Sequence, residues 1–147
     1  LKKLKGLNFT GCDLRSLPKE LGALTQLEVL DVTGNMALGT APDDVALPPE
    51  LKGMKSLWDL RLISCGLRCV PAFVRELSSL EDILLSSNEH LQFDAPLDYL
   101  LVCCPRLRVV TMKKWNGGTW TPTPLAHLWA FKLKLLEKNP SAEVEFR

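Results

Sequence analysis

The chain has 147 residues, a formal net charge of +1 and 46% hydrophobic residues, which is the size and composition of one ordinary globular domain. So small a net charge gives no general attraction to nucleic acid or to a membrane surface, and no run of about 18 apolar residues predicts a transmembrane helix. We therefore expect no nucleic-acid or membrane partner, and function has to be argued from the motifs.

A three-residue pattern, in which two apolar residues flank one variable residue, recurs along the chain. A leucine precedes each copy by three positions, and the steps between copies are 23, 30, 23 and 27 residues. Each alternation predicts a short strand with one buried face. The copies are residues 7–9, 30–32, 60–62, 83–85 and 110–112.

The position three residues after each copy is the second regular feature. It is Asn35 or Asn88 in two copies, Cys12 or Cys65 in two others, and Trp115 in the last. An asparagine has both donors and an acceptor, so it can satisfy backbone groups in a buried turn, and cysteine fits the same small buried site. Trp115 departs from the pattern and predicts the end of the regular repeats.

A proline follows an apolar residue between several of the strands, after Leu17, Leu47 and Val70. Proline is favoured at the start of a helix, so each predicts a short helical segment. A strand that returns through such a segment on the opposite side leads to a parallel neighbour.

These motifs resemble the leucine-rich repeat family over nearly the whole chain. The L-P-x-x-L-x-x-L half is similar to intracellular Ras-suppressor repeats, and plant immune-receptor repeats are also similar. The resemblance implies an α/β leucine-rich-repeat solenoid: a curved parallel sheet with short helices and loops on the convex side, about five repeats and a C-terminal helix–strand cap. Stacking buries the apolar face that a single repeat leaves open.

Two segments depart from the repeat. Residues 36–46 hold the extra length of the second repeat, which predicts a loop that either reaches towards a partner or is a tolerated insertion on the rim. In residues 89–104, the helical spacing of Leu97, Leu100, Leu101 and Cys104 predicts a longer convex helix that starts near Asp94 or Ala95.

The C-terminal part reads as a cap. Thr123 as N-cap and Pro124 as first residue predict a helix that ends at Lys138, followed by a strand over residues 142–146. We expect its buried stripe to consist of Leu125, Leu128, Trp129, Leu133 and Leu136; the alternative is that Trp129 and Phe131 dock a partner helix. We thus divide the chain into repeats at 1–115, a fragment without its N-terminal cap, and a loop, capping helix and strand at 116–147.

The cysteines favour a reducing compartment. There are five of them, and no paired framework is visible. The glycosylation sequon at Asn8 would place a glycan on the concave sheet, so we interpret it as accidental and predict a cytoplasmic protein. The adjacent Cys103 and Cys104 are interpreted as structural, because His90 and His127 complete no metal site; no metal or cofactor is expected.

The concave face is the candidate partner-binding surface, because residues between the inward pairs point out of it. Trp58, Arg61, Ile63 and Leu84 are the candidate hot spots, since aromatic residues and arginine dominate interface energies. The alternative is that Arg61 only pairs with nearby carboxylates and that the apolar residues are ordinary exposed ones. The full predicted set is Asp31, Trp58, Asp59, Arg61, Ile63, Asp82 and Leu84.

The resulting functional hypothesis is a protein–protein interaction module in intracellular signalling or recognition, not an enzyme. The chain contains neither a phosphate-binding G-x-x-x-x-G-K-[ST] loop nor an H-E-x-x-H metal motif, and no pair of nucleophile and base can be assigned. The alternative is the recognition domain of a larger enzyme, a kinase, GTPase or ubiquitin ligase, whose catalytic part lies outside this chain.

Overall fold

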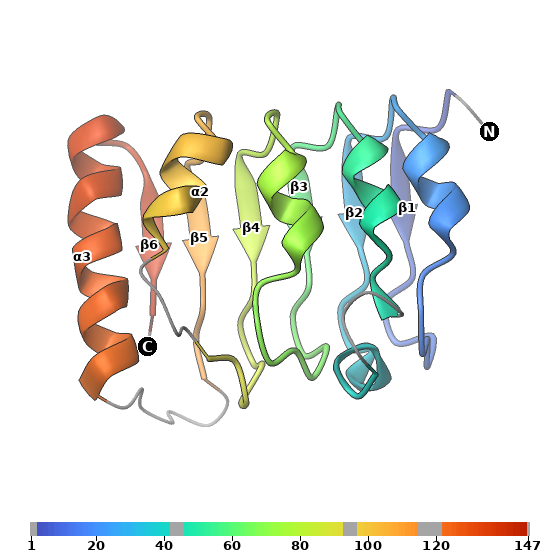
Figure 1. Ribbon diagram of the computed structural model, residues 1–147, viewed down its shortest axis with the longest axis horizontal. Coiled ribbons are helices and arrows are strands. Elements are labelled where there is room, and N and C mark those ends of the chain that lie inside the picture. Colours follow the sequence, from blue (N-terminus) through green and yellow to red (C-terminus); the bar gives the residue numbers. More distant parts are fainter. Residues whose placement is uncertain (1–2, 42–45, 93–96, 115–121, 147) are drawn as a thin grey trace.

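The computed structural model describes residues 3–41, 46–92, 97–114 and 122–146. Its strands form one parallel sheet in chain order (Figure 1). Each strand is three residues long, which matches the three-residue length of the apolar alternation in each repeat. The strands are β1 Gly6–Asn8, β2 Val29–Asp31, β3 Asp59–Arg61, β4 Asp82–Leu84, β5 Val109–Thr111 and β6 Glu143–Glu145.

Helical segments connect the strands on the other side of the molecule. Among the described residues, the short 3₁₀ helices are η1 Lys19–Ala23, η2 Met36–Gly39, η3 Pro49–Gly53 and η4 Ala72–Glu76. The α-helices with described bounds are α2 Asp98–Cys103 and α3 Pro122–Lys138. Pro18, Pro48 and Pro71 each stand immediately before a 3₁₀ helix, so the prolines mark the helix starts as predicted.

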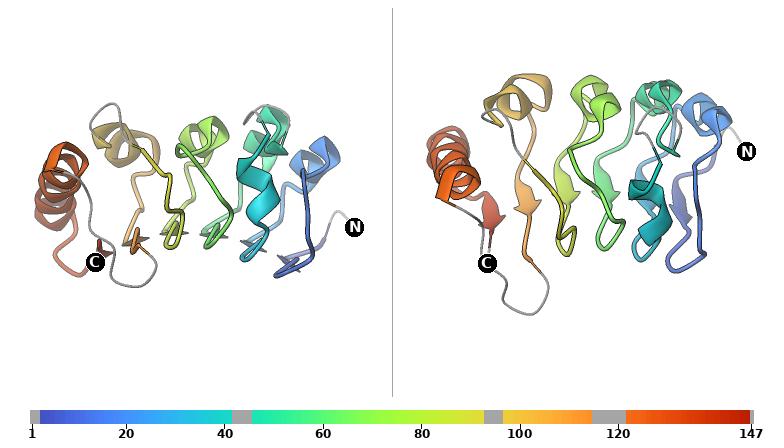
Figure 2. Two further views of the ribbon diagram at one scale, coloured as in Figure 1. Left: turned by 90° about the horizontal axis from the view of Figure 1, so that it is seen from below. Right: turned by 60° about the horizontal axis from the view of Figure 1, so that its bottom comes forward.

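The two layers form a shallow arc, with the strands on the inner side and the helices on the outer side (Figure 2, left). The strand register is the one the repeat spacing predicts, because Leu7, Leu30, Leu60, Ile83 and Val110 lie side by side along the sheet. Val144 of β6 continues this row. The predicted α/β solenoid with its helix–strand cap is confirmed.

The core runs the length of the arc between the two layers. It consists of the inward strand residues and the apolar residues of the connecting segments, among them Leu51, Leu77 and Leu100, which are fully buried. Each repeat therefore covers the apolar face of its neighbour, which is how a solenoid builds a continuous core.

The asparagine ladder is confirmed in detail. The Asn88 carbonyl oxygen accepts the backbone N–H groups of Cys65 and Leu67, each at 3.0 Å, and its amide donates to the carbonyls of Leu62 and Leu85, each at 2.8 Å. Cys65 is buried at the equivalent position, and its thiol donates to the Val32 carbonyl at 3.2 Å.

One ladder residue was predicted wrongly. Cys12 is exposed and not buried, because it follows β1, the edge strand of the described sheet, and no described repeat packs over that edge. Its thiol donates to the carbonyl of Thr10. Trp115, the last ladder position, lies outside the described residues.

Close stacking of the convex segments requires glycine at two positions. A Cβ atom on Gly22 of η1 would collide with the Glu50 carbonyl, and one on Gly53 of η3 would collide with the Gly22 carbonyl. The 3₁₀ helices η1 and η3 therefore approach to backbone contact.

Both segments that depart from the repeat differ from the prediction: the first contains a 3₁₀ helix, and the helix in the second is shorter. In the 36–46 segment, Met36–Gly39 is a 3₁₀ helix rather than loop, because Leu38 is fully buried and Gly39 packs against the Gly66 backbone; residues 42–45 lie outside the described part. The predicted longer helix is the six-residue α2, which begins at Asp98, and residues 93–96 are not described.

The helix α3 and β6 close the C-terminal end of the core, but two details of the prediction are wrong. The helix begins at Pro122, so Thr123 lies inside it and is not its N-cap. Its buried residues are Leu128, Phe131 and Leu135, whereas Trp129 and Leu133 are 47% and 61% exposed. The helix is apolar over much of its circumference, and contact with the last repeat decides which side is buried.

Within the described part of the chain, none of the helices combines the length and apolar character needed to cross a membrane.

Candidate functional site: the concave sheet

Strand pairing places outward side chains of the predicted surface in straight rows. Asp31, Arg61 and Leu84 are register partners on β2, β3 and β4. Val29, Asp59 and Asp82 form the adjacent row. Backbone bonds from Gly34 to Ile63 and from Ser64 to Ser86 extend the same register beyond the strands.

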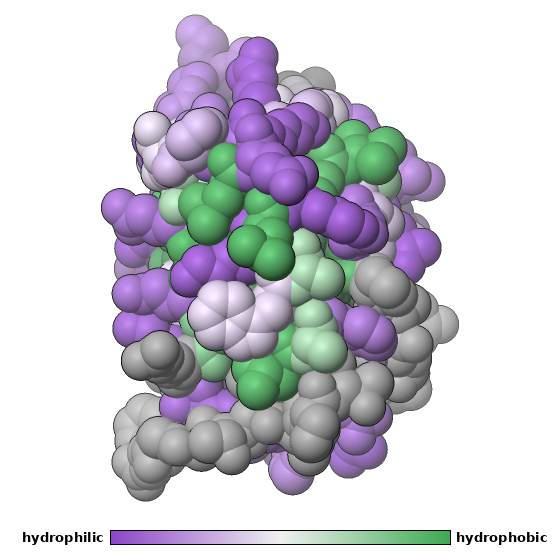
Figure 3. Space-filling model, turned by 90° about the vertical axis from the view of Figure 1, so that its left-hand side faces the viewer, coloured by the Kyte–Doolittle hydropathy of each residue, from purple (hydrophilic) through white to green (hydrophobic). Residues whose placement is uncertain are grey.

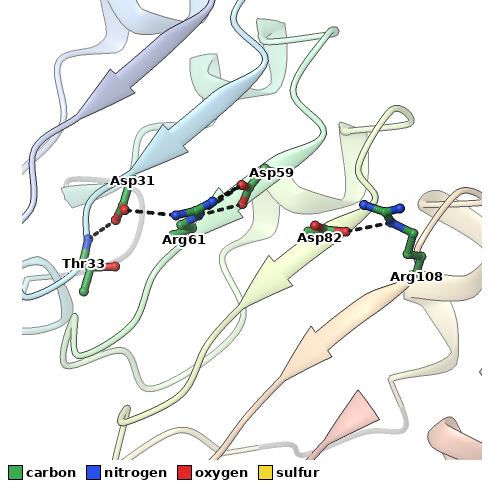
Figure 4. Close-up of polar contacts among 6 residues, drawn as sticks. All are labelled: Asp31, Thr33, Asp59, Arg61, Asp82 and Arg108. Atoms are coloured by element: carbon green, nitrogen blue, oxygen red, sulfur yellow. Dashed lines mark hydrogen bonds and ion pairs between the residues drawn. The ribbon is translucent and has the colours of Figure 1, made fainter. Parts of the chain in front are cut away.

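Arg61 lies at the centre of these rows and is held by two carboxylates (Figure 4). Its Nε donates to Asp59 Oδ1 and Oδ2 at 3.1 and 3.0 Å, and its Nη2 donates to Oδ2 at 2.6 Å. Its Nη1 lies 3.8 Å from Asp31 Oδ2. The hydrogen bonds to Asp59 are the largest cause that raises the pKa of Arg61 above its ordinary value, so the guanidinium stays charged.

Asp59 is the member of the set whose environment differs most from the prediction. It was expected on an exposed face, but its side chain is only 4% exposed because it lies beneath the Arg61 guanidinium. Asp31 is more open and also accepts the backbone N–H of Thr33 at 3.0 Å. Asp59 therefore orients Arg61 and is not itself available to a partner.

Asp82 belongs to a separate ion-pair group. Arg108 Nε lies 3.3 Å from Asp82 Oδ1 (Figure 4). It also lies 3.7 Å from Glu81 Oε2. The hydrogen bond to Asp82 raises the pKa of Arg108. Sequence reasoning had no role for Arg108, although the signal was present: Trp58, Glu81 and Arg108 each stand one residue before a strand.

The residues that stand one position before β1 and β2, Lys5 and Glu28, form a further ion pair at 2.5 Å in the same row. Trp58 lies half-buried in it, and its backbone N–H donates to the Glu28 carbonyl at 3.0 Å. Trp58 thus stands between charged neighbours rather than at an open edge.

The apolar members of the set, Ile63 and Leu84, are half-buried. Leu84 pairs with Arg61 across β3 and β4, and Ile63 follows Arg61 by two residues on the same face. The structure therefore brings an oriented guanidinium and two apolar side chains together, a combination suited to protein contact.

The cysteine thiols and the potential metal ligands of the described residues are the remaining reactive groups. None of the five cysteines forms a disulfide, and burial raises the pKa of the Cys65 and Cys104 thiols to about 11 and about 12, which makes them poor nucleophiles at neutral pH. Across residues 3–41, 46–92, 97–114 and 122–146, no group of three or more potential metal ligands is present.

Comparisons with known proteins agree with this architecture. No family model matches the chain. The TMV resistance protein N of Nicotiana glutinosa is 33% identical over 115 residues, which cover 62% of this chain and 10% of that protein. The chain thus spans about a tenth of the length of that curated relative.

A solved structure of a leucine-rich-repeat protein from Leptospira interrogans superposes with a TM-score of 0.60. The match covers 89% of this chain and 28% of that one, at 21% identity. At this identity the likeness concerns the fold.

Proposed function

We propose that this leucine-rich-repeat solenoid is a protein-interaction module. Its partner-binding surface, here called the concave site, consists of Asp31, Trp58, Arg61, Ile63, Asp82 and Leu84, together with the buried Asp59, which orients Arg61 and does not contact the partner itself. Solenoids of this type present extended concave surfaces that bind other molecules.

The observation that carries the proposal is the orientation of Arg61. Its side chain is 44% exposed, yet three hydrogen bonds to Asp59 hold its guanidinium in one place. A partner that binds it does not have to immobilise a free arginine side chain, which would otherwise cost about 0.5–1.5 kcal/mol. Leu84 and Ile63 supply apolar area beside it.

The charges of the concave site favour a protein over a nucleic acid. Asp31, Asp59 and Asp82 outnumber the one arginine within it. Nucleic-acid binding needs a continuous basic surface that neutralises phosphates, and these carboxylates would repel a phosphate backbone. We therefore expect a polypeptide partner.

The cellular context belongs to the same proposal. Five cysteines that form no disulfide, two of them fully or almost fully buried, are typical of a reducing compartment. Asn8 is exposed on the concave side, where a glycan would cover the sheet. We place the module in the cytoplasm, in signalling or recognition, and the name of the curated relative, a resistance protein, supports recognition.

An affinity pull-down with mass spectrometry tests the concave site. The wild-type chain is compared with Arg61→Glu/Leu84→Asp, using extract from the native cells. The matched control is Lys52→Glu/Val102→Asp, which makes the same kinds of change at exposed convex residues. We expect a protein that is enriched by the wild type and the control and lost with the concave variant. Equal recovery by all three proteins would refute the concave site.

The alternative is that the chain is the recognition part of a larger enzyme. Its alignment with a tenth of a much longer relative supports this possibility. Assaying kinase, GTPase and ubiquitin-ligase activity in the natural full-length protein and in this chain decides between the two. Activity in the full-length protein alone, changed by the concave variant, supports the alternative.

A further inference from the structure

A pocket at the C-terminal end of the solenoid lies apart from the concave site. It has a volume of about 260 Å³ and lies between α3 and the last strand. We call it the end pocket. Its lining residues are Lys113, Trp129, Lys132, Val144, Glu145 and Phe146.

The cation at the end pocket is held in place. Lys132 Nζ donates to the Val144 carbonyl at 3.1 Å and lies 5.3 Å from the centre of the Trp129 ring. An ammonium group has three N–H donors, so the bond to Val144 leaves further donors for a ligand. The ring contact also stabilises the charge in this position.

The two other charged residues of the end pocket have opposite charges and neutralise each other. Lys113 Nζ lies 2.7 Å from Glu145 Oε2, so these two residues form an ion pair. The charge of Lys132 then gives the lining a net charge of +1. The complementary group is a single anion, and a carboxylate can accept a charge-assisted hydrogen bond from the ammonium.

An apolar surface adjoins this cation. Trp129 and Leu133, one turn apart on α3, are 47% and 61% exposed. Figure 3 shows hydrophobic residues gathered over this end of the molecule, with hydrophilic residues around them. Aromatic rings that are partly exposed beside a fixed charge are typical anchor points of protein interfaces.

We propose that the end pocket binds a segment of a protein partner in which a carboxylate side chain stands next to a bulky apolar side chain. The carboxylate accepts a hydrogen bond from Lys132, and the apolar side chain packs against Trp129 and Phe146. The volume is below the usual range of small-molecule sites, about 300–1,000 Å³, and suits one or two side chains. Leu133 lies where the segment continues along α3.

The test uses two peptides of equal size and measures the indole N–H resonance of Trp129 by NMR. The probes are acetyl-Glu-Phe-Glu-amide and its neutral match acetyl-Gln-Phe-Gln-amide. The chain has four tryptophans, so Trp129→Phe assigns the resonance. We expect a saturable shift with the acidic peptide and binding about tenfold or more weaker with the neutral one, as one charge-assisted hydrogen bond predicts.

Two lysine variants on α3 provide the matched comparison. Lys132→Gln should weaken the acidic peptide about tenfold, whereas Lys138→Gln, whose ammonium donates to the Leu101 carbonyl away from the pocket, should leave it unchanged. The concave variant Arg61→Glu/Leu84→Asp should also bind normally, which separates this proposal from the proposed function. Equal affinity for the two peptides, no saturable shift, or unchanged affinity in Lys132→Gln would overturn it. The peptide comparison needs only wild-type protein and holds even if a variant fails to fold.

Discussion

Asn88 and Cys65 occupy equivalent positions of successive repeats and are bonded directly, because the Asn88 side-chain carbonyl accepts the Cys65 backbone N–H at 3.0 Å. The same asparagine also binds backbone groups of Leu62 and Leu67 in the preceding repeat and of Leu85 and Ser86 in its own. One buried side chain therefore connects two turns of the solenoid.

We expect Asn88→Ala to lower the free energy of unfolding by about 2–4 kcal/mol, because it leaves several buried backbone groups without partners. Asn35→Ala should cost less. Asn35 makes the same kinds of bond, but two of its partners belong to Cys12 and Leu14, which are not fully buried, so water can replace it. Denaturant unfolding measures both. An equal or larger loss in Asn35→Ala would contradict this account.

The backbone contact between η1 and η3 leads to the second prediction. Gly53→Ala places a methyl group against the Gly22 carbonyl, and backbone at this position cannot move without separating the two helices. We expect a loss of about 2 kcal/mol or more, within the range of overpacked sites. The thermal midpoint and denaturant unfolding measure it.

Gly6→Ala is the matched control for Gly53→Ala. A Cβ atom on Gly6 would meet nothing within 4 Å, so its effect should stay within about 0.5 kcal/mol, as at ordinary surface positions. If Gly53→Ala were as harmless as Gly6→Ala, the convex helices would not be in fixed contact.

The buried Asp59 leads to the third prediction. Arg61→Met removes three hydrogen bonds from a carboxylate that is 4% exposed. We expect a loss of about 1–3 kcal/mol, because the carboxylate stays desolvated without its partner. Arg108→Met should cost less, since its partners Asp82 and Glu81 are more accessible to water.

A double-mutant cycle measures the interaction energy between Asp59 and Arg61 separately from the effect of each single substitution. In Asp59→Val/Arg61→Met the buried charge is gone, and valine suits this row because Val29 is the register partner of Asp59. The double variant should recover most of the stability lost in Arg61→Met. Simple addition of the two single effects would show that Asp59 and Arg61 do not act as a pair.

The fourth prediction concerns pH. Burial raises the pKa of the Cys65 thiol to about 11, whereas in an unfolded chain a cysteine ionises near about 8.5. Between these two pH values the Cys65 thiol is ionised in the unfolded chain but stays neutral in the folded one. The stability contributed by the neutral thiol is therefore complete below about pH 8.5 and is lost as the pH rises towards about 11.

Urea unfolding at about pH 8 and about pH 10.5 checks this effect. Wild type and Cys12→Ala should lose similar amounts of stability between the two conditions, because Cys12 is exposed. Cys65→Ala should start less stable and lose less on the same change of pH. A loss in Cys65→Ala as large as in the wild type would assign the effect to other groups.

The repeat spacing alone determined the strands, their parallel register and the asparagine ladder. Residues 30–32 and 60–62 could be aligned without coordinates because each repeat must present the same apolar positions to its neighbour. The helix starts immediately after Pro48 and Pro71 were predictable for a similar reason, since proline restricts its own backbone locally. The rows of the concave site follow from the register.

Tertiary structure decided which side chains are buried, because burial depends on the neighbouring residues and not on the repeat period. Asp59 is buried because Arg61 folds over it, and Arg108, one residue before β5, reaches Asp82 on the neighbouring strand β4. Leu128 was predicted correctly as buried on α3, but Trp129 and Leu133 were not, because apolar residues surround much of that helix and only contact with the last repeat selects the buried side. Exposure of Cys12 likewise depends on whether another repeat covers it. Local patterns specify backbone positions, but burial is a property of the complete set of contacts around each side chain.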